Sequence, residues 1–382
     1  MYIDSLDQFN HDRNTMGSNP ETRSAHPFFM FDHMHEQPSA IAETWQRNRA
    51  GLLEFTRLLT RRSEIVLTGT GTSLHAAMLG EYWLRTIAGL RNVRAISAFD
   101  LANYAGTFPS DGALIVVSHR GWKQFSAKAV ATARNSGLLT ASISGQGPAE
   151  GARTADHVFI TTEQETSGAH TKSLTTALGL LLELACELAV YAGRAPRAAA
   201  ARAEFQRIPD RLMQRLRVDA QERAAAERFR EFRRIVFIGG GPAFVCAREA
   251  ALKVKEAAFA WAEGIDVEEF LHGPIAAADR ETLAVLISAG GAAAPRVHQT
   301  AAALAEVGAA RLAVALRADD KLGALCDAHI AVEGDDELTA PFALLLSLQL
   351  FTYYSALARG TNPDLNHRED PRFVRAAKHY QL

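Results

Sequence analysis

The feature that most constrains the fold of this chain is an internal repeat with an offset of about 170 residues. Three apolar segments recur in the same order: IVLTGTGTS (65–73) as IVFIGGGPA (235–243), ALIVVS (113–118) as LAVLIS (283–288), and HVFITT (157–162) as HIAVEG (329–334). A long apolar segment with helical character follows each set, at 172–190 and 341–358. A repeat of this kind predicts that the chain folds as two similar units.

Within each unit, short β-branched apolar segments alternate with helical segments. In the first half the expected elements are strand 64–68, helix 73–87, strand 92–96, strand 113–117, helix 122–136, strand 139–143, strand 157–161 and helix 171–192. Strands that are apolar on both faces and alternate with helices are typical of a parallel sheet covered by helices on both sides. The sequence therefore predicts an α/β protein with two tandem doubly wound, flavodoxin-like domains.

The repeat also predicts where the domains begin and end. We expect a polar N-terminal lead-in at 1–45, a first sheet domain at 46–200, a helical connector at 201–218, and a second sheet domain with a C-terminal tail at 219–382. Two domains of ~150–190 residues are the usual division of a chain of this length.

Composition excludes several classes of function. A formal net charge of −2 does not favour a nucleic-acid partner. The three cysteines lie far apart and form no CxxC pair, as expected of buried thiols in a reducing compartment. The polar, acidic N-terminal residues are unlike a signal peptide, and no apolar run free of charge approaches the ~20 residues that span a bilayer. We therefore expect a cytoplasmic protein without a membrane partner.

Three turns of the first half carry hydroxyl groups where a strand meets a helix. GTGTSLHAA (69–77) places Thr72 and Ser73 beside the first helical N–H groups, a favourable arrangement for a phosphate. SHRGWKQFS (118–126) and ETSGAHTKS (165–173) are the other two. Because ligands bind at the carboxyl ends of parallel strands, the three turns can converge on one anion. The alternative for the first turn is a plain glycine-rich turn with Ser73 as N-cap.

The second half lacks these hydroxyls and carries a charged helix instead. Glu249, Lys253 and Glu256 are spaced i, i+4 and i+7, so they share one helix face, and His272 follows in a rigid His-Gly-Pro corner. A histidine so placed is a candidate acid–base group. The alternative is a solvated, salt-bridged helix face. No HxxxH motif or Cys/His cluster is present, so we expect neither a metal nor another cofactor.

The combined pattern GTS…S-x-x-G…E-x-x-x-K-x-x-E…HGP resembles the sugar isomerase (SIS) superfamily in its double-domain form. It is most similar to the isomerase half of glutamine–fructose-6-phosphate aminotransferase (glucosamine-6-phosphate synthase), and the resemblance covers residues 34–382. That family includes phosphosugar deaminases, ketose/aldose isomerases and fructosamine-phosphate deglycases, so the resemblance implies a small-molecule sugar phosphate as ligand.

The resemblance also implies roles for single residues. Glu256 matches the carboxylate that carries a proton between C1 and C2 of the open-chain sugar, and Glu249 and Lys253 match its helix partners. His272 matches a residue tied to ring opening that reaches in from the neighbouring subunit. Lys378, within RAAKHYQL (375–382), matches a lysine that engages the sugar carbonyl. The family therefore predicts a homodimer with a shared active site.

The phosphate turn departs from the family pattern. Where the family reads S-Q-S-G-E-T, this chain reads S-H-R-G-W-K from Ser118 onward. We expect phosphate to be bound by Thr72, Ser73, Ser118, His119, Arg120, Lys123 and Ser126, with guanidinium and ammonium charge in place of neutral donors. In the alternative, Arg120 and Trp122 face outward and the loop accommodates a bulkier substrate.

The expected function is a phosphosugar isomerase or glucosamine-6-phosphate deaminase in amino-sugar metabolism. The family's glutaminase domain begins with a nucleophilic cysteine, whereas residue 2 here is Tyr2, so we expect a glutamine-independent reaction on a hexose or amino-hexose 6-phosphate such as glucosamine 6-phosphate or fructose 6-phosphate. Two alternatives stay open: a fructosamine-phosphate deglycase and a non-catalytic sugar-phosphate sensor.

Overall fold

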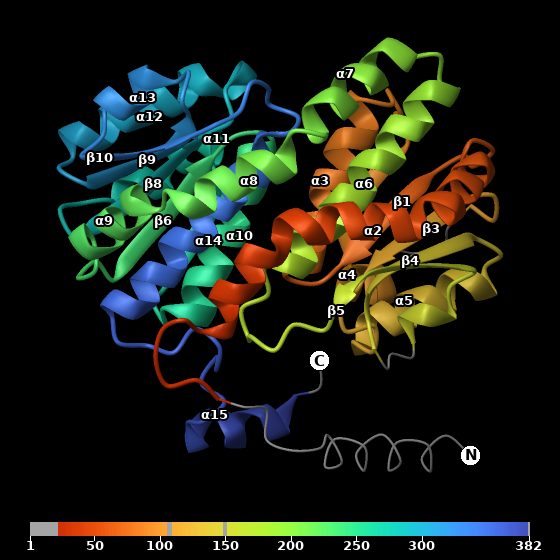
Figure 1. Cartoon of the computed structure of the whole chain (residues 1–382), viewed down its shortest axis with the longest axis horizontal. Helices are drawn as coiled ribbons and strands as arrows, with labels where there is room; N and C mark the ends of the chain where they lie inside the picture. Colours follow the sequence, from red (N-terminus) through yellow and green to blue (C-terminus); the bar gives the residue numbers. More distant parts are fainter. Residues whose placement is uncertain (1–21, 105–108, 148–150, 381–382) are drawn as a thin grey trace.

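The computed structural model describes residues 22–104, 109–147 and 151–380. Figure 1 shows two sheet domains side by side, the first coloured orange to yellow and the second teal to blue, with the long red helix α2 (Phe29–Leu59) starting beside the second domain and running across the first. Tyr2 and the N-terminal half of the expected lead-in lie outside the described residues.

The first sheet is fully parallel, with strand order β2-β1-β3-β4-β5. Its strands are β1 (Ile65–Gly69), β2 (Val93–Ser97), β3 (Ala113–Val117), β4 (Leu139–Gln146) and β5 (His157–Glu163). Its helices are α3 (Thr72–Thr86), α4 (Ala98–Tyr104), α5 (Gln124–Asn135) and α6 (Lys172–Tyr191). This order is that of a doubly wound, flavodoxin-like sheet.

The second sheet repeats the first, with strand order β10-β9-β8-β6-β7. Its strands are β6 (Arg234–Gly239), β7 (Ala262–Asp266), β8 (Thr282–Ser288), β9 (Ala310–Leu316) and β10 (Ala328–Val332). Its helices are α10 (Pro242–Ala257), α11 (Val267–Leu271), α12 (Ala294–Glu306), α13 (Asp320–Ala324) and α14 (Ala340–Ala358). The predicted fold class is therefore confirmed.

The repeat extends to backbone geometry at the first turn of each sheet. Gly71 and Gly241 precede α3 and α10 with the same φ of 58° and ψ of −129°. Gly69 and Gly239 stand at the ends of β1 and β6, where an added Cβ would lie 2.5 Å from backbone of the following helix. The tight strand-to-helix turn therefore requires glycine at these positions.

Helix α2 (Phe29–Leu59) includes the second part of the expected lead-in, where the sequence shows little periodicity and no helix was expected. The helix contacts α6 of the first domain and α14 of the second. Its buried face includes polar side chains such as Gln37, which accepts a hydrogen bond from Thr175 at 2.9 Å and donates one to Gln349 at 2.7 Å. Because these buried positions are polar, the usual apolar period is hidden.

The remaining helices join or follow the two sheets. They are α7 (Ala195–Phe205), α8 (Ile208–Arg217), α9 (Ala220–Arg228) and α15 (Pro371–Ala376). The expected connector, 201–218, covers the end of α7 and all of α8. The division into a lead-in, two domains and a connector stays our proposal.

Helices α6 and α14 are the two that are long and apolar enough to cross a membrane among the described residues. The sequence expectation that charge interrupts every such run is wrong for 340–358, which has no charged residue. Both helices are almost wholly buried inside the protein, α14 between α10, α9 and α8. A helix that is apolar all round is typical of a large protein core.

Candidate active site

The centre of the candidate site is the Glu249 carboxylate, which α10 of the second domain directs at the start of α3 in the first. One carboxylate oxygen accepts a hydrogen bond from Thr72 Oγ1 at 3.0 Å. The other lies 2.6 Å from His75 Nδ1. The side chain of Glu249 is 1% exposed. The two domains are therefore joined by a buried charged group at the predicted phosphate turn.

Lys253 lies one turn further along α10 and contacts two carboxylates. Its Nζ is 3.4 Å from Glu249 Oε1 and 2.5 Å from Glu256 Oε2. The Lys253 side chain is 2% exposed, whereas that of Glu256 is 22% exposed. The expected alternative of a solvated helix face is therefore wrong for Glu249 and Lys253, and Glu256 alone of the three opens toward solvent.

The surroundings of Glu249 and Glu256 shift the pKa values of these two carboxyl groups in opposite directions. Burial alone would raise the pKa of Glu249, but the charge of Lys253 and the hydrogen bonds from His75 and Thr72 outweigh it and lower that pKa to about 2. Burial raises the pKa of Glu256, and Lys253 offsets this only in part. Burial would lower the pKa of Lys253, but both carboxylates raise it. Glu249 therefore stays ionised, while Glu256 takes up a proton more readily than an exposed glutamate does.

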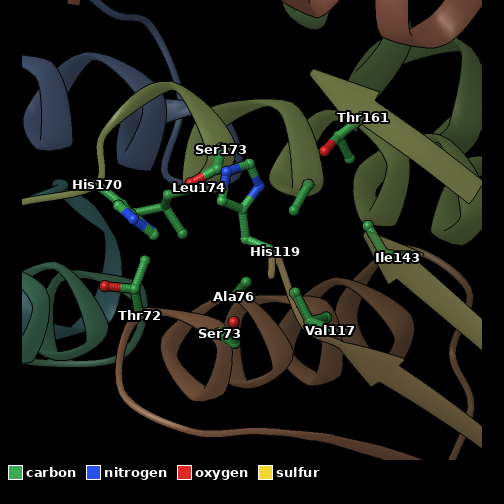
Figure 2. Close-up of a pocket in the computed structure, with 11 residues that line it drawn as sticks. Thr72, Ser73, Ala76, Val117, His119, Ile143, Thr161, His170, Ser173 and Leu174 are labelled. Atoms are coloured by element: carbon green, nitrogen blue, oxygen red, sulfur yellow. The ribbon is translucent and has the colours of Figure 1, made fainter. Parts of the chain in front are cut away.

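A small cavity lies where the three predicted turns meet. It is lined by Thr72, Ser73, Ala76, Val117, His119, Ile143, Thr161, His170, Ser173, Leu174 and Ala177. Figure 2 shows the residues of α3 facing those at the start of α6 across the cavity, with His119 between them. The convergence of the first, second and third turns on one cavity is thus seen in the structure.

The second turn contributes polar atoms that lack partners among the described residues. Ser118 is 3% exposed and its Oγ has no hydrogen-bond partner, and the same holds for His119 Nδ1. His119 Nε2 accepts a hydrogen bond from the Glu165 N–H at 3.3 Å. Burial lowers the pKa of His119 to about 4, so its ring is neutral at pH 7. A neutral ring with Nε2 as acceptor carries its proton on Nδ1, which leaves that N–H available to a ligand.

The two cationic side chains of the second turn, Arg120 and Lys123, point to different neighbours. Arg120 Nη2 lies 3.1 Å from the Glu165 carbonyl oxygen, to which it donates, and 3.4 Å from His170 Nε2. The guanidinium thus faces the third turn, in contrast to the alternative in which it faces outward. The Lys123 ammonium lies 4.8 Å from the centroid of the Trp122 ring. Phosphate binding by these residues and by the buried Ser126 stays a prediction.

The third turn is built around the fully buried carboxylate of Glu165. Its oxygens accept hydrogen bonds from the N–H groups of Thr171, Lys172 and Ser173 at 2.8–3.2 Å, which caps the start of α6. Burial alone would raise the pKa of Glu165, but His33, whose Nδ1 lies 3.3 Å from Glu165 Oε2, and the nearby rings of His170 and His119 hold it well below its usual range. The α6 N-terminus is therefore already neutralised by this chain's own carboxylate.

His119, Glu165 and His170 bring ligand-type atoms within 4.8 Å of one another. The sequence contains no motif that announces such a cluster, because the three residues come from two different turns. The Glu165 oxygens are occupied by backbone donors, and the Arg120 guanidinium lies beside His170. These contacts favour an anion at the cavity over a metal cation.

We predict that Glu165→Gln destabilises the protein by about 2–4 kcal/mol at pH 7, because an amide cannot accept from all of these donors. The pKa of Glu165 is depressed in the folded state, so its stabilising effect is full above the unfolded value of about 4.3 and is lost as pH falls below it. Urea unfolding of both proteins should therefore show a difference that is largest at neutral pH and narrows in acid. Glu163→Gln, at an exposed position nearby, is the matched control. An equal difference at all pH values would contradict the prediction.

In the second domain, the counterparts of the first and second turns lie beside the carboxylate of Glu337. An added Cβ at Gly291 would lie 2.4 Å from the Glu337 carboxylate, and one at Gly241 would lie 3.8 Å from it. The Tyr82 hydroxyl bonds to the same carboxylate. A carboxylate at this place repels a second anion, which agrees with the absence of hydroxyls from the sequence of these turns.

Two predicted catalytic residues lie apart from this cluster. His272 is 69% exposed and its Nε2 lies 2.9 Å from Glu268 Oε1. Lys378 lies in a short exposed 3₁₀ turn after α15, at the C-terminal end of the described chain. The family resemblance places His272 in the site of a neighbouring subunit, so the roles of His272 and Lys378 stay predictions.

Three residues of the site were missed by the sequence analysis, although all lie within the turns that it singled out. They are His75, Glu165 and His170. The one available signal was the spacing of His75, three residues after Thr72 and hence on the same side of the helix. Their partners lie on other elements, so no local pattern distinguishes them from ordinary helix or loop residues.

Comparison with known proteins identifies the domain type. The SIS domain profile matches this chain twice, at residues 58–186 and 228–359. A glutamine–fructose-6-phosphate aminotransferase of Thermococcus kodakarensis is 27% identical over 347 residues. That match covers 90% of this chain and 57% of the relative, so the chain corresponds to little more than half of that enzyme's length.

Two solved structures share the fold. The C-terminal domain of glucosamine-fructose-6-phosphate aminotransferase from Francisella tularensis matches with a TM-score of 0.83 and 21% identity, covering 90% of this chain and 99% of that one. Tagatose-6-phosphate ketose/aldose isomerase from Escherichia coli matches with a TM-score of 0.75 and 22% identity, covering 91% of this chain and 98% of that one. Both likenesses therefore extend over both domains.

Proposed function

The chain belongs to the SIS domain family, and from that premise we propose that it is a phosphosugar isomerase or deaminase acting on a hexose or amino-hexose 6-phosphate. The names of its relatives support this proposal, since they act on fructose 6-phosphate or tagatose 6-phosphate. We further propose that it works as a cytoplasmic homodimer in which His272, and near the C-terminus Lys378, complete the site.

The observation that carries the proposal is the contrast between the two carboxylates of α10. Glu249 is enclosed by hydrogen-bond donors and stays ionised, so it cannot carry a proton. Glu256 has one cationic partner, a raised pKa and access to solvent. A group that moves a proton between two carbons is favoured by a raised carboxyl pKa and by an open side chain, and of the two glutamates only Glu256 has both.

In the proposed reaction Glu256 takes the proton from C2 of an open-chain aldose and returns it to C1. The electron pair of the C2–H bond forms the C1–C2 double bond of an enediol, or of an enol-amine where C2 carries nitrogen, while the oxygen on C1 gains a proton. When the proton returns to C1, the oxygen or nitrogen on C2 loses one, which leaves a ketone or an imine at C2. For glucosamine 6-phosphate the product is an imine at C2, which water hydrolyses to fructose 6-phosphate and ammonia. The reaction needs neither glutamine nor a redox cofactor, and the Lys253 ammonium holds Glu256 close to its ionised form at the start.

The phosphate would be held at the cavity by the first and second turns. Ser73 lines the cavity in the first turn of α3, beside the helix N-terminal N–H groups, and the second turn adds the unpartnered Ser118 Oγ and His119 Nδ1–H. Binding energy from the phosphate would then hold the distant C1–C2 bond over Glu256.

We predict that Ser118→Ala raises KM for the sugar phosphate by about 10- to 100-fold, because a hydrogen bond to a charged group contributes about 1.5–3 kcal/mol. Stability should not fall, since Ser118 Oγ has no partner among the described residues. Steady-state kinetics with a thermal unfolding curve measure both effects. Ser136→Ala, at the exposed end of α5, is the control. An unchanged KM would remove Ser118 from the phosphate site.

The experiment that tests the function is ammonia release from glucosamine 6-phosphate by the purified protein, with Glu256→Gln as control. Release by the parent protein and not by the variant supports a deaminase. Exchange between fructose 6-phosphate and glucose 6-phosphate, without ammonia release, supports an isomerase. Release of an amino acid from a fructosamine phosphate would point to a deglycase instead, and tight binding of fructose 6-phosphate without any turnover would point to a sensor.

A further inference from the structure

His75 stands on α3, almost one turn after Thr72, and its side chain is 7% exposed. Its Nδ1 lies 2.6 Å from Glu249 Oε2. Because the ionised carboxylate can only accept, Nδ1 of the ring carries the proton and donates it. His75 thus supplies one of the two hydrogen bonds by which the first domain satisfies Glu249, Thr72 supplying the other.

The Lys253 ammonium is shared between two carboxylates that compete for it. It lies 2.5 Å from Glu256 and 3.4 Å from Glu249, so the contact with Glu256 is the closer. Glu249 is the more deeply buried of the two and would attract the ammonium more strongly if its own charge were left uncompensated. The hydrogen bond from His75 compensates part of that charge.

We propose that His75 is a positioning residue: by satisfying Glu249 from the first domain, it leaves the Lys253 ammonium on Glu256. This inference rests on the proposed function, in which Glu256 carries the proton. It goes further because it assigns control over the ionisation of Glu256 to His75, a residue of the other domain. His75 makes no hydrogen bond to Glu256 and is not proposed to contact the substrate.

Other titratable groups also act on Glu256 and Lys253. Glu256 is influenced by Lys253 and Glu249 on its own helix and by His75 on α3. Lys253 is also influenced by Glu165 of the third turn, and its own charge acts on His170 there. None of these groups other than His75 is altered in the experiment below, so a change in the ionisation of Glu256 reports on the His75 contact.

The test compares His75→Leu with His75→Asn. The asparagine amide nitrogen can take the place of Nδ1 and still donate to Glu249, whereas leucine cannot donate. With leucine we expect Lys253 to move toward Glu249 and the pKa of Glu256 to rise. The acid limb of the pH profile of kcat/KM should then shift upward by ~1 pH unit, with KM for the sugar phosphate unchanged within experimental error. With asparagine the profile should stay close to that of the parent protein.

A second readout needs no substrate. Infrared titration of the protonated carboxyl band, with the spectrum of Glu256→Gln subtracted, measures the pKa of Glu256 directly. An upward shift in His75→Leu and not in His75→Asn supports the inference even if no substrate turns over, in which case the proposed function alone fails. An unshifted titration in folded His75→Leu overturns the inference while leaving the proposed function untouched.

Should His75→Leu fail to fold, Thr72→Val carries the same test. It removes the other hydrogen bond from the first domain to Glu249. The infrared titration of Glu256 should again shift upward, and an unchanged value would overturn the inference. Thermal unfolding of each variant shows whether it is folded before the titration begins.

Discussion

Replacement of Glu256 by glutamine should lower turnover by about 10²- to 10⁴-fold, because general acid–base catalysis by a positioned carboxyl group contributes an effect of that size. Glutamine keeps the volume and the polarity of the side chain but cannot exchange a proton. Since the phosphate would be held at the other end of the substrate, binding of fructose 6-phosphate should change little. Steady-state kinetics and isothermal titration calorimetry separate the two effects.

The matched control is Glu263→Gln, which alters an exposed carboxylate shortly after the same helix. It should leave both turnover and binding unchanged. Retention of turnover in Glu256→Gln would refute the assignment of the proton carrier. A joint loss of turnover and binding would instead mean that Glu256 holds the substrate in its ground state.

The second large effect is expected at Trp83, where replacement by alanine should destabilise the protein by about 3–5 kcal/mol. The ring is fully buried on α3 and stacks on Phe342 of α14, with ring centroids 5.8 Å apart. Its Nε1 donates to the Leu338 carbonyl oxygen at 2.8 Å. The variant therefore loses a packed ring and leaves that carbonyl unsatisfied, at the contact between the two domains. Urea unfolding measures the loss.

Two controls separate the contributions at Trp83. Trp83→Phe keeps a stacked ring but removes the Nε1 donor, so it should cost about 1–3 kcal/mol. Trp261→Ala removes a ring that is 79% exposed and should have almost no effect on stability. Two separate unfolding transitions in Trp83→Ala would mean that the two domains unfold independently once this contact is lost. A loss below 1 kcal/mol would contradict the prediction.

Much of the fold could be predicted because its signals are local. β3 begins and ends at the predicted residues, and β1, β4, β5 and α6 differ from the prediction by a few residues at most. These segments are apolar and have clear glycine turns between them. Helix α2 was not predicted over 29–45, because its buried face includes Gln37 and other polar residues whose partners lie on α6 and α14.

The residues of the site were predicted better than their arrangement. The spacing of Glu249, Lys253 and Glu256 showed that they share a helix face, but not that the face is buried against another domain. The contact that reveals this, between Thr72 and Glu249, joins residues 177 positions apart. The direction of Arg120 toward the third turn was equally hidden, since it depends on the Glu165 carbonyl and on His170.

The sequence by itself determined that this protein has two parallel-sheet domains and that its charged helix belongs to the second. The apolar period and the glycine turns depend on residues close together in the chain, and the repeat is a likeness between two stretches of sequence, so none of the three requires the tertiary structure. The tertiary structure decided which of two glutamates on one helix has a lowered pKa and which a raised one. Glu249 and Glu256 are chemically identical, and their pKa values move in opposite directions because His75 and Thr72 of the other domain donate hydrogen bonds to one and not to the other.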